Sequence, residues 1–116
     1  METKELDLIE RKCGACNAET PPLKGEELQK YYDRLEDGWE LEDDHHLEKT
    51  YPFKNFREAM DFTVRVGEMS EEEAHHPEIY LTWGEVILKV YTHAIDALSE
   101  NDFIWAAKAE AIYEER

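Results

Sequence analysis

The segment NFREAMDFTVRVGEMSEEEAHHPEIYLTWGEVILKV, residues 55–90, predicts an amphipathic helix followed directly by a β-hairpin. Asn55 is suited to cap the helix, because its side chain can accept a hydrogen bond from a backbone N–H of the first turn. The apolar positions then recur every three or four residues until Pro77, whose ring and missing N–H exclude further helix. Beyond it, apolar and polar residues alternate on both sides of Gly84-Glu85, as a tight hairpin requires.

The sequence on either side of this segment supplies three further helices or strand pairs. A helical pattern starts at Gly25 and closes at Gly38, and two alternating runs then predict a pair of strands within residues 39–53. Ser99 and Asp102 form a capping pattern that opens a last helix. The predicted order is α-β-β-α-β-β-α, an α+β fold with a four-stranded, mostly antiparallel sheet and three helices on one face.

Composition limits the classes of function. The chain has 116 residues with 13 basic and 29 acidic side chains, a formal net charge of -16. Such a charge repels a polyphosphate backbone, so we expect no nucleic-acid partner, and no stretch is apolar enough to predict a membrane span. The N-terminus has no apolar core of a secretory signal, so we expect a cytoplasmic protein. A buried homo-oligomer interface would offset the self-repulsion.

Residues 1–24 are expected to form an N-terminal extension, and residues 25–116 the domain itself. The extension contains Cys13 and Cys16, the two cysteines of the chain. One Cys-x-x-Cys provides half of a four-ligand zinc site, so a metal role would require zinc shared between subunits.

Histidine is the residue type best suited to proton transfer here, and the chain has five. His45 and His46 lie in a predicted polar turn, where we expect no functional role. His75 follows Glu71 by four residues at the end of the central helix, where a carboxylate on the same face would orient or charge an imidazole.

His93 is expected to end the last strand, and the hairpin would return it close to Pro77 and therefore to His75. Three histidines also suggest catalytic zinc, but the neighbours His75 and His76 diverge in regular backbone, and spacings of the His-x-His kind are absent. An ordinary helix end with a solvated Glu–His pair is the alternative that spacing alone leaves open.

Seven positions together resemble the signature of the pterin-4a-carbinolamine dehydratases, and the likeness extends over residues 25–116. These positions are Glu71, His75, His76, Pro77, Trp83, His93 and Asp102. The resemblance implies a sheet with three helices on one side, a homodimer or homotetramer, and no cofactor. It also implies dehydration of 4a-hydroxytetrahydropterin to quinonoid dihydropterin.

The resemblance further implies roles for individual residues. His75 and His93 would transfer protons, and His76 would steady developing charge. Glu71 and Asp102 would support the imidazoles. The substrate contacts would come from Pro77 and from Trp39, whose ring would form an apolar wall for the pterin.

Two other functions remain open at this stage. Animal members of the family also act as dimerisation cofactors of a transcription factor, which would make the chain a protein-binding module. A dehydratase-like chain could also act on another pterin, such as one of molybdenum cofactor metabolism.

Overall fold

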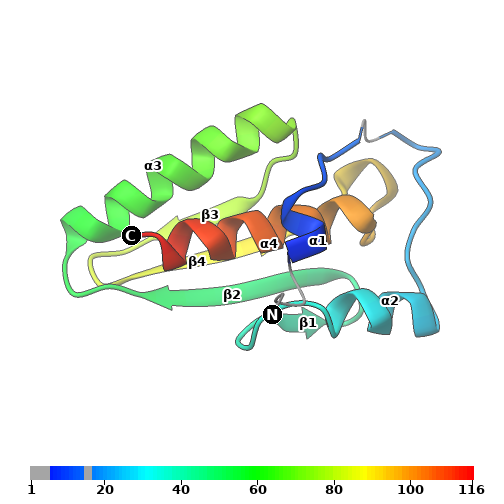
Figure 1. Cartoon of the computed structure of the whole chain (residues 1–116), viewed down its shortest axis with the longest axis horizontal. Coiled ribbons are helices and arrows are strands. Elements are labelled where there is room, and N and C mark those ends of the chain that lie inside the picture. Colours follow the sequence, from blue (N-terminus) through cyan, green and yellow to red (C-terminus); the bar gives the residue numbers. More distant parts are fainter. Residues whose placement is uncertain (1–5, 15–16) are drawn as a thin grey trace.

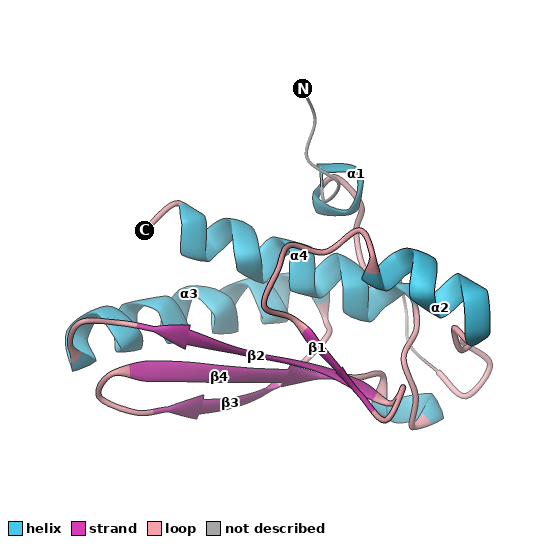
Figure 2. Cartoon of the chain, turned by 90° about the horizontal axis from the view of Figure 1, so that it is seen from below, coloured by secondary structure: helices cyan, strands magenta, loops and turns pink. Residues whose placement is uncertain are grey.

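A four-stranded antiparallel sheet with helices on one face forms the framework of the protein, as predicted (Figures 1 and 2). The computed structural model describes residues 6–14 and 17–116. The elements are α1 (Leu6–Ile9), α2 (Gly25–Tyr32), β1 (Glu40–Glu42), β2 (His46–Pro52), α3 (Phe56–Glu73), β3 (Glu78–Leu81), β4 (Glu85–Val90), a 3₁₀ turn η1 (His93–Ile95) and α4 (Glu100–Glu114).

The sheet has the strand order β1-β2-β4-β3, so the two hairpins meet where β2 pairs with β4. Side chains on the helix side are buried completely or almost so: Leu47, Tyr51, Val86, Leu88 and Val90. The side chains between them are partly or fully exposed, because successive residues of a strand point to opposite faces. Figure 2 shows the described helices on one side of the sheet only.

Helix α4 lies at the centre of the helical layer, in contact with α1, α2, α3 and β2 (Figure 1). Its middle is buried all round, which fits a helix that is apolar on every face. Both predicted caps are confirmed. Asn55 Oδ1 accepts from the Glu58 N–H at 2.9 Å, and Ser99 with Asp102 forms a reciprocal capping box.

Two predicted boundaries are wrong. Helix α2 ends at Tyr32, before Gly38. In the second hairpin Leu81 pairs with Val86, so the turn consists of Trp83-Gly84 and lies one residue earlier than predicted. Thr82 fixes this register because its N–H donates to the Glu85 carbonyl and its hydroxyl accepts from the Glu85 N–H.

The described part of the N-terminal extension lies directly against α4. Leu8 of α1 is fully buried. Gly14 and Asn101 exchange two hydrogen bonds, of 2.9 and 3.2 Å, between backbone and side-chain amide. No helix among the described residues is both long and apolar enough to cross a membrane.

Candidate functional site

The end of α3 directs His75 into the protein. Ala74 follows the helix in the left-handed conformation, with φ 54°. The His75 N–H then donates back to the Ser70 carbonyl at 3.1 Å, which closes the helix end. The chain therefore turns after Ala74, and only 5% of the His75 surface remains exposed.

Asp102 is the partner of His75 and is itself fully buried. The His75 Nε2 lies 2.6 Å from Asp102 Oδ1. Since an ionised carboxylate only accepts hydrogen bonds, Nε2 of His75 donates the hydrogen bond to Asp102. Burial of the pair also keeps water from competing for this bond, so the ring is held in one tautomer.

The other oxygen of Asp102 connects the pair to the segment that follows β4. Asp102 Oδ2 accepts from Thr92 Oγ1 at 2.8 Å and from the Ser99 N–H at 2.8 Å. Because Thr92 uses its single hydroxyl proton for Asp102, the Ser99 hydroxyl donates to Thr92 Oγ1 at 2.7 Å. One carboxylate thus joins the end of α3, the start of α4 and the residue next to His93.

The prediction that Glu71 supports His75 directly is not what the geometry shows. Glu71 Oε2 lies 2.5 Å from Nε2 of His76, and both side chains are mostly exposed. The left-handed turn at Ala74 takes His75 off the helical face that four-residue spacing assumes. Glu71 therefore orients His76, while Asp102 holds His75.

His93 does not end a strand, contrary to the prediction. Strand β4 ends at Val90, Thr92 forms an isolated bridge with Ala97, and His93 begins η1. The inward side chain of Thr92 bends the chain toward Asp102 and leaves His93 exposed to solvent. His93 nevertheless directly follows Thr92, which is hydrogen-bonded to the same Asp102 carboxylate as His75.

Trp39 and Pro77, the predicted substrate contacts, lie in different surroundings. Trp39 is only 3% exposed and packs edge-on against Tyr51, with ring centroids 6.2 Å apart. Its ring therefore belongs mainly to the core, although Trp39 also lines a cavity of about 300 Å³ that contains no histidine. Pro77 is half-buried between His76 and the first residue of β3.

The cysteine pair gives no metal site that the structure can describe. Cys13 Sγ lies 3.5 Å from the Asn101 carbonyl oxygen, and its N–H donates to Glu73 Oε1 at 2.9 Å. Cys16 lies outside the described residues. Within residues 6–14 and 17–116, no group of three or more histidine, cysteine or acidic side chains is arranged to hold a metal ion.

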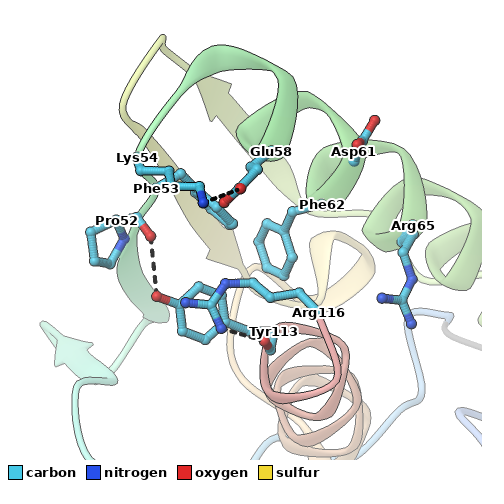
Figure 3. A pocket seen from close by; sticks show the side chains of 9 residues that line it. All are labelled: Pro52, Phe53, Lys54, Glu58, Asp61, Phe62, Arg65, Tyr113 and Arg116. Atoms are coloured by element: carbon cyan, nitrogen blue, oxygen red, sulfur yellow. Dashed lines mark hydrogen bonds and ion pairs between the residues drawn. The ribbon is translucent and has the colours of Figure 1, made fainter.

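The surface cavities include three of about 860, 550 and 300 Å³, and the first of these lies away from these histidines (Figure 3). Aromatic side chains form its floor between β2, α3 and the end of α4, and charged ones surround them. Its lining residues are Pro52, Phe53, Lys54, Glu58, Asp61, Phe62, Arg65, Tyr113 and Arg116. The other two, of about 550 and 300 Å³, also contain no histidine.

Three residues to which the sequence analysis gave no part in the site belong to it or adjoin it. Thr92 and Ser99 complete the hydrogen bonds of Asp102. The capping pattern could have identified Ser99, but no pattern indicates the inward turn of Thr92. His45, predicted to be a plain turn residue, has its ring 4.5 Å from that of Tyr91.

Comparisons with known proteins agree on one group. A family model described as "Pterin 4 alpha carbinolamine dehydratase" matches residues 21–112. A protein of Rubrobacter xylanophilus named "Putative pterin-4-alpha-carbinolamine dehydratase" is 49% identical over 106 residues, which cover 91% of this chain and 98% of that protein. A protein of Alkaliphilus metalliredigens with the same name is 45% identical over 104 residues, or 90% and 94% of the two chains.

A solved structure shares the fold. It is described as the crystal structure of a transcriptional coactivator/pterin dehydratase from Brucella melitensis. Its TM-score is 0.73 at 27% identity, and the match covers 79% of this chain and 98% of that one.

Proposed function

The chain belongs to the pterin-4a-carbinolamine dehydratase family of hydro-lyases, and we propose that it dehydrates 4a-hydroxytetrahydropterin by acid–base catalysis on its histidines. The C4a–O bond breaks, the hydroxyl leaves as water with an added proton, and N5 loses a proton as the C4a=N5 bond forms. Atoms and charges balance without an oxidant, a reductant or a metal. The protein must therefore supply one proton donor and one proton acceptor, each with a pKa near neutrality.

The buried pair of His75 and Asp102 is the observation that carries this proposal. A carboxylate that joins three segments of the chain fixes the imidazole in one orientation and one tautomer, which is what proton transfer at a defined atom requires. His75 and His93 act as the two proton-transfer groups. Thr92 keeps the His93 segment attached to the same carboxylate.

His76 and Glu71 act beside them at the solvent-facing side. The Glu71 carboxylate, 2.5 Å from Nε2, orients the ring of His76, which steadies negative charge on the departing oxygen. Pro77 ends this segment and borders the substrate. Trp39 is not included in the site because it is buried in the core.

The physiological role that fits this reaction is recycling of a pterin cofactor after a hydroxylation that uses molecular oxygen. Catalysis in the cytoplasm by a homo-oligomer is part of the proposal. Large exposed apolar side chains, including Phe56 and Val64 on α3 and Trp83 at the hairpin turn, support association of chains. Light scattering of the purified protein measures its oligomeric state.

The coactivator named in the description of the Brucella structure belongs to a different class of function. The net charge of -16 disfavours direct contact with DNA, so that role would require a protein partner. Turnover of a carbinolamine by the purified chain alone separates the two functions.

The test is a stopped-flow assay on synthetic 4a-hydroxytetrahydropterin. We expect His75→Ala and His93→Ala each to lower kcat at least about tenfold, because positioned acid–base groups typically contribute about 10²–10⁴. Glu72→Gln, a change at an exposed neighbour of Glu71, is the control and keeps the wild-type rate. Wild-type rates in both histidine variants, with each variant folded, would refute the proposal.

A further inference from the structure

We propose that His45 and Asp96 position the imidazole of His93 through the ring of Tyr91, so that the turn between β1 and β2 supports catalysis. This inference rests on the proposed function, in which His93 transfers a proton. It assigns a role to a histidine whose sequence context indicates only an exposed turn.

Tyr91 lies between two imidazoles. Its ring centroid is 4.4 Å from that of His93, at an interplanar angle of 74°, and 4.5 Å from that of His45, at 43°. Contacts of this kind between aromatic rings favour a defined geometry. His93 has no hydrogen bond to its ring from the described residues, so the Tyr91 edge contact is what restrains it.

His45 is in turn fixed by the loop that carries His93. Its Nε2 lies 2.8 Å from Asp96 Oδ1, and its Nδ1 lies 3.2 Å from Nδ1 of His46. The Asp96 N–H donates to the His93 carbonyl at 3.2 Å. The contacts therefore run from His93 to Tyr91, to His45, to Asp96 and back to the His93 backbone.

The backbone conformation of Asp96 also supports this role. This residue adopts the left-handed conformation, with φ 50° and ψ 45°, which favours glycine. A non-glycine residue is strained in this region, although aspartate tolerates it better than most. Its carboxylate on His45 gives a reason for aspartate at this position.

The segment that carries His93 is held in place by contacts on two sides. Inside, Thr92 is fully buried and bonded to Asp102, which fixes the backbone next to His93. Outside, the neighbouring Tyr91 fixes the ring. A positioning error of about 1 Å at a proton-transfer group can cost as much as about a hundredfold in rate, so loss of the outer contact is expected to lower kcat.

The experiment compares His45→Ala, Tyr91→Ala, Tyr91→Phe and the double variant His45→Ala/Tyr91→Ala in the stopped-flow assay. Tyr80→Ala, a tyrosine change on the exposed edge strand β3, is the control. We expect His45→Ala and Tyr91→Ala to lower kcat about three- to tenfold with KM little changed, and Tyr91→Phe, which keeps the ring, to restore the rate. Because His45 acts through Tyr91, the double variant should be no slower than Tyr91→Ala.

A readout independent of turnover is the NMR signal of the His93 Cε1–Hε1 group. His45→Ala and Asp96→Gly do not alter a residue whose ring touches the His93 ring, yet both should shift this signal. Glycine at position 96 removes the carboxylate and suits the left-handed backbone. An unchanged His93 signal in both folded variants would overturn the inference.

The outcomes separate this inference from the proposed function. A wild-type kcat in His45→Ala together with an inactive His93→Ala would overturn the positioning role and leave the catalytic role of His93 intact. Wild-type rates in both His93→Ala and His75→Ala would instead overturn the proposed function. The His93 signal would then still decide whether the ring depends on His45.

Discussion

The Nε2 atom of His75 lies 2.6 Å from Oδ1 of Asp102, in a pair that is almost completely buried. The two residues are 27 positions apart and come from the end of one helix and the first turn of another. The same carboxylate caps α4 and accepts from Thr92. The proposed catalytic geometry and the stability of the fold therefore depend on one side chain.

Replacing Asp102 tests this dual role. Asp102→Asn keeps the shape but removes the charge and turns an acceptor into a donor, so we expect kcat to fall by about 10²-fold or more. Because breaking a buried pair from one side costs about 3–5 kcal/mol, urea unfolding should show a large loss of stability as well. Asp61→Asn, at an exposed position of α3, is the control and should change neither quantity.

Glu71→Gln should separate catalysis from stability. The pair with His76 is exposed, and surface ion pairs contribute about 0–1 kcal/mol, so the melting temperature should stay close to that of the wild type. The rate should fall several-fold because His76 loses the carboxylate that orients its ring. A rate equal to that of Glu72→Gln would contradict the role given to Glu71.

The contribution of Glu73 to the free energy of unfolding should depend on pH. Burial acts to raise the pKa of this carboxyl, but hydrogen bonds from Lys108 and the Cys13 N–H and nearby positive charge outweigh it and lower the pKa below 4.5. The folded form therefore holds its proton less firmly than the unfolded chain. This contribution is complete above pH 4.5 and is lost as the pH falls through the lowered pKa.

Glu73→Gln should thus reduce the free energy of unfolding by at least about 1 kcal/mol at pH 7, because hydrogen bonds to charged groups contribute about that much or more. The difference from the wild type should shrink below pH 4.5. Urea unfolding across this range measures it. A constant difference at every pH would show that packing, and not charge, explains the loss.

His46 should titrate below the ordinary histidine range. Burial, followed by the positive charges of Lys89 and His45, lowers its pKa from 6.5. Below pH 6.5 the unfolded chain binds a proton here that the folded chain does not, so this contribution to stability falls as the pH drops toward the lowered pKa. NMR titration of the His46 ring measures the pKa, and a value above 6.5 would contradict the prediction.

The fold could be predicted from local patterns because each pattern has a local cause. The Asn55 cap, the stop before Pro77 and the Ser99–Asp102 capping box depend on residues a few positions apart. Apolar periodicity then assigns a face to each helix and strand. The hairpin turn was misplaced by one residue because the Thr82 hydroxyl, and not glycine alone, sets the register.

The site was only partly predictable for the same reason. The sequence by itself determined which residue types are available: histidines at a helix end and after a strand, with acidic residues nearby. Only the tertiary structure decided the partners, since one left-handed residue at Ala74 sends His75 inward to Asp102 and leaves Glu71 to His76. Helical spacing fixes neighbours only while the helix continues, and contacts between distant segments depend on how the elements pack.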